Sequence, residues 1–261
     1  MGQSAVGAMA LAALLAPQNY RRPKENSLTL AHERKFLGGV LRLAAKRDCM
    51  FIETLPEATQ RSLELLGAKK ITRGFYLAGG SALALHLGHR LSVDLDFFTV
   101  QSFDALALSR RLAQADTFTQ EQRKKDTLLG AFAQVKVSFF RYSYPMLAPT
   151  ATVLNTAIAS VPDIGAMKLD AIGTRGRKRD FIDLYFVCRA GHSLEEVLGW
   201  YREKYQGVEV NLIHYIKALT YFEEAEADPM PRMLKRVSWD RAKRFFEKEA
   251  PPLLRKIAQA A

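Results

Sequence analysis

Two aspartates separated by a single residue carry the strongest chemical signal in this chain. Asp94 and Asp96 lie in a run in which apolar and polar residues alternate. Successive side chains of a strand point to opposite faces, so both carboxylates are expected on one solvent-facing surface, with Val93, Leu95 and Phe97 pointing into the core.

Two carboxylates held on one face repel each other unless a cation lies between them. At a separation of about 7 Å the repulsion is roughly 2 kcal/mol for an effective dielectric constant of about 20. Oxygen ligands suit a hard ion such as Mg²⁺, which commonly binds one or two carboxylates together with substrate phosphates. The pair Asp94 and Asp96 therefore predicts a magnesium site, and a nucleotide is the natural substrate.

A Gly-Gly-Ser turn a short distance upstream supplies the second half of this pattern. Residues 75–78 are expected to form a strand that breaks at Gly79 and Gly80, and Ser81 is expected to cap a helix that Gly88 ends. Glycines let a ligand approach the backbone, and the N–H groups of a new helix attract anions. Each piece alone is common in proteins, but their combination places a triphosphate beside the metal.

At these residues the chain resembles the nucleotidyltransferase superfamily that includes DNA polymerase beta, and more closely the AbiEii/AbiGii family of bacterial toxins. The resemblance rests on residues 76–85, 92–98 and 161–187. It implies an α+β fold, in which a small mixed-sheet nucleotidyltransferase core is followed by a helical C-terminal lobe. It also implies a set of nucleotide-binding residues: Gly79, Gly80, Ser81, Ser92 and Lys168.

The block over residues 161–187 predicts two helices joined by a basic turn. Pro162 and Asp163 fit a helix start, whereas Gly173 and Gly176 are expected to interrupt that helix. From spacing alone, Lys168 fits a solvated surface charge. The resemblance instead implies that Asp163 and Lys168, in an Asp-x-x-x-x-Lys element, bind nucleotide phosphates.

The second helix of this block carries Asp180 and Asp183, which share a face because they are three residues apart. Pairing with neighbouring arginines is their ordinary role. The resemblance suggests instead that Asp183 completes the active site, which gives the catalytic set Asp94, Asp96, Lys168 and Asp183.

The chain departs from the polymerase-like pattern at one position. Such transferases commonly supply a third carboxylate from a neighbouring strand, and the strand expected over residues 132–142 has Ser138 there. A serine is neither an anionic metal ligand nor a general base. Either Asp183 substitutes, or the metal site is simpler, or catalysis is weak, which argues against a full two-metal mechanism.

The charge balance favours a polyanionic partner. The chain has 38 Lys and Arg against 27 Asp and Glu, for a net charge of +11. Basic residues beside Lys168 are expected to contact RNA phosphates, namely Arg175, Arg177, Lys178 and Arg179. Aromatic residues near the C-terminus either stack on unpaired bases or belong to the core, and the two cysteines support neither a zinc site nor a disulfide framework.

Three segments are expected along the chain. Residues 1–50 form a partly disordered N-terminal extension, 51–160 the nucleotidyltransferase core and 161–261 the helical lobe. The apolar stretch over residues 5–16 is too short to span a bilayer and lacks a basic flank, so a cytoplasmic protein without a membrane partner is expected. The expected helices cover 56–66, 103–115, 163–172, 178–189, 194–205, 210–227 and 239–248, with strands near 118–124 and 132–142.

These features together predict a Mg²⁺-dependent nucleotidyltransferase that transfers a nucleoside monophosphate from a nucleoside triphosphate (NTP). The resemblance implies an RNA acceptor, the 3′ end of tRNA, and a toxin–antitoxin or phage-defence setting with a cognate antitoxin protein. Two alternatives stay open: transfer to a protein hydroxyl, and a catalytically degenerate fold that only binds nucleotide or RNA.

Overall fold

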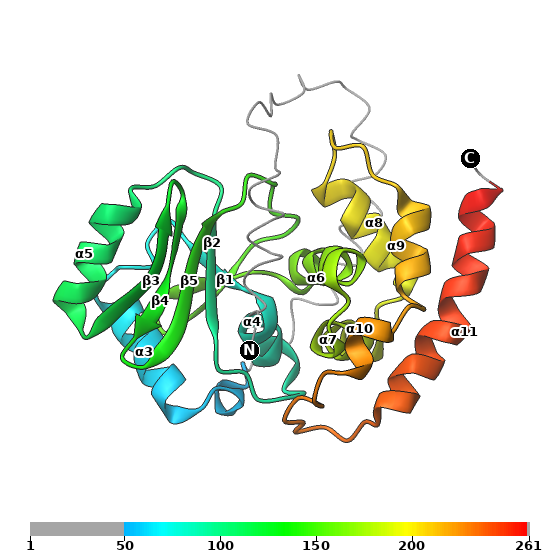
Figure 1. Ribbon diagram of the computed structural model, residues 1–261, viewed down its shortest axis with the longest axis horizontal. Coiled ribbons are helices and arrows are strands. Elements are labelled where there is room, and N and C mark those ends of the chain that lie inside the picture. Colours follow the sequence, from blue (N-terminus) through cyan, green and yellow to red (C-terminus); the bar gives the residue numbers. More distant parts are fainter. Residues whose placement is uncertain (1–49, 260–261) are drawn as a thin grey trace.

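The computed structural model describes residues 50–259, and it places a sheet and its helices beside a second group of helices (Figure 1). The sheet has seven strands in the order β3-β4-β5-β2-β1-β7-β6. Strand β1 is antiparallel to β2 but parallel to β7, and β2 is parallel to β5, so the expected mixed sheet is confirmed. The strand bounds are β1 Tyr76–Ala78, β2 Leu95–Thr99, β3 Phe118–Lys124, β4 Thr127–Phe132, β5 Val135–Arg141, β6 Ala151–Val153 and β7 Thr156–Ile158.

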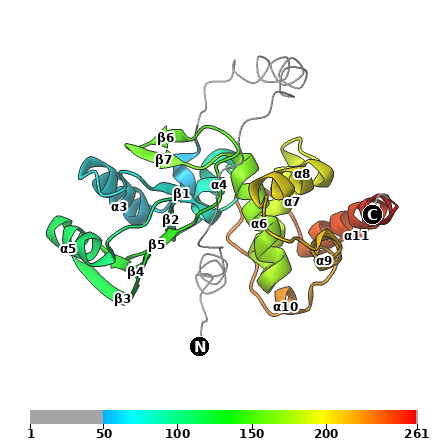
Figure 2. The same cartoon turned by 90° about the horizontal axis from the view of Figure 1, so that it is seen from above.

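The helices of the sheet region are the 3₁₀ helix η1 Ile52–Thr54, α3 Glu57–Ala68, α4 Gly79–Leu87 and α5 Ala105–Ala115. Figure 2 shows α3 and α5 on one face of the sheet and α4 on the other. Helix α5 begins at Asp104, whose carboxylate accepts hydrogen bonds from two backbone N–H groups of the first turn. Helix α4 is apolar and mostly buried, because it lies between the sheet and the second group of helices.

The second group contains α6 Val161–Arg175, α7 Lys178–Arg189, α8 Leu194–Lys204, α9 Leu212–Ala218, α10 Glu223–Glu226 and α11 Trp239–Ala258. Gly176 ends α6 in the left-handed region, with φ of 52°, as expected. Gly173 does not interrupt the helix. A Cβ there would lie 2.4 Å from the ring of Tyr215, so the glycine lets that ring pack against α6.

Four strand and helix expectations need correction. The expected strand over 132–142 is only the second arm of a hairpin, because Ala133 and Gln134 turn the chain between β4 and β5 at φ of 46° and 67°. Strands β6 and β7 were not expected. The helix expected over 210–227 is split into α9 and α10, and the last helix extends to Ala258, so that Leu253 is buried. Among residues 50–259, no helix is long and apolar enough to cross a membrane.

The C-terminal aromatic residues pack against the core. Phe246 is fully buried, and Phe245 and Trp239 are partly buried against the same cluster, so they are not an open stacking surface for bases. The expectations for residues 1–49 lie outside the described residues.

A buried ion pair fixes the start of α6. Asp163 is fully buried, and its Oδ1 lies 2.7 Å from the Nζ of Lys204, which is also fully buried in α8. The same carboxylate accepts hydrogen bonds from the Ser160 hydroxyl and the Leu147 N–H. Asp163 is therefore a structural residue, and its expected contact with nucleotide phosphates is wrong because no part of it is exposed.

The variant Asp163→Asn is expected to lose about 3 kcal/mol or more of its free energy of unfolding, because it leaves the Lys204 ammonium buried without an opposite charge. Urea unfolding measures this loss. The double variant Asp163→Asn with Lys204→Met should lose less than the sum of the two single variants. A loss of nucleotide affinity without any loss of stability in Asp163→Asn would contradict the structural role.

Candidate active site

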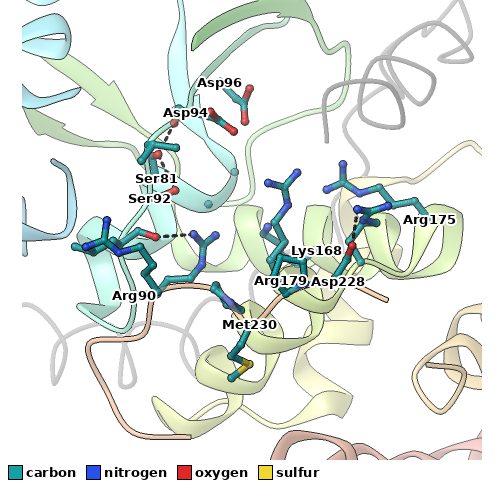
Figure 3. Close-up of a pocket in the computed structure, with 18 residues that line it drawn as sticks. Ser81, Arg90, Ser92, Asp94, Asp96, Lys168, Arg175, Arg179, Asp228 and Met230 are labelled. Carbon is teal, nitrogen blue, oxygen red and sulfur yellow. Dashed lines mark hydrogen bonds and ion pairs between the residues drawn. The ribbon is translucent and has the colours of Figure 1, made fainter. Parts of the chain in front are cut away.

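A cleft of about 430 Å³ lies between the sheet region and the second group of helices (Figure 3). Its walls come from the start of α4, residues 90–94 with Asp96 of β2, helix α6, the start of α7, and the connection between α10 and α11. Ten of the site residues expected from the sequence line it: Gly79, Gly80, Ser81, Ser92, Asp94, Asp96, Lys168, Arg175, Arg177 and Arg179.

The two glycines have separate geometric roles at the floor of the cleft. Gly79 has φ of +67°, and a Cβ there would lie 3.2 Å from Oδ2 of Asp96. A Cβ on Gly80 would lie 2.2 Å from Nη2 of Arg90. Glycine is favoured at the first position because the backbone there is left-handed, and a side chain at the second position would displace the Arg90 guanidinium.

Ser81 does not cap α4, because the helix starts at Gly79 and its N-cap, Ala78, makes no side-chain cap. The Ser81 hydroxyl instead donates to the carbonyl oxygen of Asp94 and lies 3.0 Å from the Ser92 Oγ. These contacts tie α4 to the segment before β2. They leave the first N–H groups of α4 uncapped by any side chain.

The carboxylates of Asp94 and Asp96 lie side by side at one end of the cleft (Figure 3). Oδ1 of Asp96 is buried and has no hydrogen-bond partner among the described residues. Burial raises the pKa of Asp96, and the negative charge of Asp94 raises it further, although Ser138 and two arginines act in the opposite direction. An orphaned buried oxygen beside a second carboxylate fits a bound cation.

Val93, expected in the core, is 55% exposed and lines the same cleft. Strand β2 begins only at Leu95, so the strict alternation does not extend back to Val93.

Ser138 occupies the position next to Asp96 on strand β5, where the two residues are paired in register. Its side chain is fully buried, and it supplies a neutral hydroxyl in place of a third carboxylate. Within residues 50–259, no group of three or more His, Cys, Asp or Glu side chains could hold a metal ion. A cation at this site would thus have two protein carboxylates, and Mg²⁺ commonly completes such a shell with substrate phosphates and water.

A chain of five charged side chains, four of them buried, extends from the lining of the cleft into the protein. Asp183 accepts two hydrogen bonds from Arg90, at 2.7 and 2.8 Å, and its Oδ2 lies 2.7 Å from the Nζ of Lys168. The same Nζ lies 2.8 Å from Oδ1 of Asp180, whose other oxygen pairs with Arg175 at 2.9 Å. Burial alone would raise the pKa of Asp183, but Arg90 and Lys168 outweigh it and hold that pKa well below its ordinary value.

Asp183 and Lys178 are the two expected site residues that do not line the cleft. Asp183 is fully buried, and both of its oxygens are engaged by side chains, so it positions Arg90 and Lys168 and does not itself reach a substrate. The Lys178 ammonium turns away and donates to the backbone carbonyls of Glu226 and Asp228, so it is not placed to contact RNA.

The structure adds lining residues that the sequence motifs do not predict. They are Arg90 and, from the connection between α10 and α11, Asp228, Met230 and Arg232. Four of the six lining cations are paired with carboxylates: Arg90, Lys168, Arg175 and Arg177. Among the described residues, Arg179 and Arg232 make no such pair, so they carry the positive charge that an anionic ligand can use.

Comparison with known proteins finds one relative in sequence and two solved structures with some similarity, from three bacteria. A protein of Aquifex aeolicus (strain VF5), described as uncharacterized protein aq_aa25, is 35% identical over 205 residues, which cover 77% of this chain and 98% of that protein. The crystal structure of JHP933 from Helicobacter pylori aligns with a TM-score of 0.48 at 18% identity, over 79% of this chain and 96% of the other. MenT4, a nucleotidyltransferase toxin of Mycobacterium tuberculosis, aligns with a TM-score of 0.40 at 14% identity, over 75% and 85%.

A family model described as nucleotidyl transferase AbiEii toxin, type IV toxin–antitoxin system, matches residues 63–152 and 134–260. The two matches together span most of the described chain, including every wall of the cleft. The chain therefore belongs to the AbiEii family of nucleotidyltransferase toxins.

Proposed function

We propose that this nucleotidyltransferase toxin uses Mg²⁺ to transfer a nucleoside monophosphate from an NTP to RNA, and that the acceptor is the 3′ end of tRNA. The observation that carries the proposal is the pair of adjacent carboxylates, Asp94 and Asp96, in one cleft with a glycine turn and two arginines that no carboxylate of residues 50–259 pairs with. The proposed setting is the cytoplasm, in a toxin–antitoxin or phage-defence system with a cognate antitoxin.

Asp94 and Asp96 would hold the Mg²⁺. When bound, the ion would neutralise negative charge on the phosphates as the bond to the leaving group breaks. The orphaned Oδ1 of Asp96 supports this assignment, because a buried carboxylate oxygen without a hydrogen-bond donor is stabilised by a cation.

The triphosphate would lie along the glycine turn. Gly79 and Gly80 line the cleft, and the uncapped N–H groups at the start of α4 favour an anion. Arg179 and Arg232 would bind phosphate oxygens from the opposite walls of the cleft. Lys168 contributes less than expected from the sequence, since Asp180 and Asp183 already hold its ammonium group.

In the proposed reaction, the acceptor hydroxyl oxygen attacks the α-phosphorus and forms a phosphodiester bond. The bond between the α-phosphorus and the bridging oxygen breaks, pyrophosphate leaves, and the hydroxyl proton passes to solvent. The chain contributes mainly by positioning and charge, as is general for phosphoryl and nucleotidyl transfer. An RNA acceptor is supported by the net charge of +11 and by the arginines at the cleft.

The purified protein with Mg²⁺ and α-³²P-labelled NTPs is expected to label RNA in a total tRNA pool. Asp94→Asn should lower the labelling rate by about 100-fold or more, because it removes half of the negative charge that holds the cation. The matched control is Asp240→Asn, which changes an exposed aspartate in the first turn of α11, outside the cleft.

Digestion with nuclease or with protease identifies the acceptor in the same assay. Label that nuclease removes supports RNA, and label that only protease removes would replace RNA by a protein hydroxyl. Full labelling by Asp94→Asn would contradict the assigned site.

Asp96→Asn is expected to raise the melting temperature of the metal-free protein at neutral pH. The raised pKa of Asp96 means that the folded state disfavours the charged carboxylate. The free energy of unfolding therefore falls as the pH rises from the ordinary aspartate pKa through the raised one. Asparagine carries no charge, so the variant does not lose this stability at neutral pH. Thermal unfolding with and without Mg²⁺ should show the native protein stabilised by the ion and the variant almost unaffected; equal Mg²⁺ stabilisation of both would argue against Asp96 as a ligand.

Arg179→Ala is expected to weaken NTP binding about tenfold, which corresponds to roughly 1.4 kcal/mol for a charge-assisted contact to phosphate. Titration calorimetry with a non-hydrolysable NTP measures this change. Arg202→Ala, an exposed arginine of α8 outside the cleft, serves as the control. Equal affinity in the two variants would remove Arg179 from the phosphate site.

A further inference from the structure

The connection between α10 and α11 forms a strap over residues 228–235 that is fixed at both ends. At its start, the Asp228 carboxylate accepts a hydrogen bond of 3.1 Å from the N–H of Lys178, at the beginning of α7. Toward its end, the carbonyl oxygen of Arg232 accepts a hydrogen bond of 2.8 Å from the N–H of Leu91. The strap thus joins the second group of helices to the segment before β2, and Asp94 is the last residue of that segment.

The residues between these two anchors are Pro229, Met230 and Pro231. Each proline fixes its own φ, and Pro231 also restricts Met230 to an extended backbone. Met230 is 36% exposed, and it lines the cleft on the side opposite the aspartate pair (Figure 3). A ligand that contacts Met230 would meet a backbone that is already ordered, so little conformational entropy is lost on binding.

The lining of the cleft is partly charged and partly apolar. It includes the aspartate pair and the glycine turn, and Leu91, Val93 and Met230 add apolar side chains. Val93 and Met230 are among the large apolar side chains that the described chain leaves exposed. An NTP likewise combines a charged part with an apolar one, since its triphosphate is joined to a base with flat, weakly hydrated faces. The cleft volume of about 430 Å³ is in the range of small-molecule sites.

We propose that Met230, together with Leu91 and Val93, forms the nucleobase-binding surface of this cleft. The inference rests on the proposed NTP substrate and adds the part of the chain that holds its base. The Met230 thioether would contact the face of the base, as methionine sulfur does with aromatic rings, while the phosphates lie toward the glycine turn. The strap between α10 and α11 is therefore the element that holds the base in the active site.

The strap provides a matched control. Leu234 is also an apolar residue of the strap and is 49% exposed, but it lines a separate hollow formed by residues 233–238 and Arg241. Met230→Ala, Met230→Leu and Leu234→Ala would be compared in the full-length protein. Titration calorimetry with Mg²⁺ would use the α,β-methylene analogues of the four common NTPs, and inorganic tripolyphosphate as the ligand without a base.

Met230→Ala should weaken the tightest-binding analogue about five- to tenfold, Met230→Leu should restore most of that affinity, and Leu234→Ala should bind like the native protein. All variants should bind tripolyphosphate equally. Equal analogue affinity in Met230→Ala and Leu234→Ala would overturn the inference. So would an equal loss of tripolyphosphate binding in Met230→Ala, or a loss confined to RNA binding, which would assign the surface to the acceptor.

This experiment separates the inference from the proposed function. It measures nucleotide binding without any acceptor, so a wrong acceptor would appear only in the labelling assay and leave these affinities unchanged. Absence of nucleotide binding in the native protein would overturn both.

Discussion

The chain of charged side chains that extends from the lining of the cleft into the protein is the constraint on which the rest of the site depends. Arg90, which follows α4, reaches Asp183 of α7, and Lys168 of α6 lies between Asp183 and Asp180. Breaking one member of a buried ion pair typically costs several kcal/mol, because it leaves an uncompensated charge in a low-dielectric interior. These ion pairs therefore hold the glycine turn and the two helices in one arrangement, and Gly80 is needed so that the Arg90 guanidinium can pass beside the turn.

The same arrangement separates charge across the cleft. Asp180 and Asp183 pair with cations of one wall, whereas Asp94 and Asp96 repel each other, and Oδ1 of Asp96 accepts no hydrogen bond from the described residues. A protein that only needed stability would not retain two adjacent carboxylates in this state. The cleft thus combines two adjacent acids with Arg179 and Arg232, which form no ion pair within residues 50–259. This combination matches a metal ion and a polyphosphate, and it agrees with membership of a nucleotidyltransferase family.

The sequence predicted those parts of the site that lie close together along the chain. The spacing of Asp94 and Asp96, and of the glycines before them, determines their geometry locally, and the mixed sheet followed by helices was expected from the resemblance. The three-residue spacing did not show that Asp183 is buried, because two aspartates one helical turn apart occur both on exposed helix faces and in buried ion pairs. The β4–β5 hairpin was missed because Ala133 and Gln134 are unusual residues for a left-handed turn, and Met230 was missed because only the tertiary fold brings the strap to the cleft.

The most direct test of this account is a crystal structure with Mn²⁺ and a non-hydrolysable NTP, in which anomalous scattering locates the metal. The account predicts an anomalous peak beside the carboxylates of Asp94 and Asp96, with the triphosphate along Gly79 and Gly80. A metal or nucleotide bound elsewhere, with these two carboxylates left free, would contradict it.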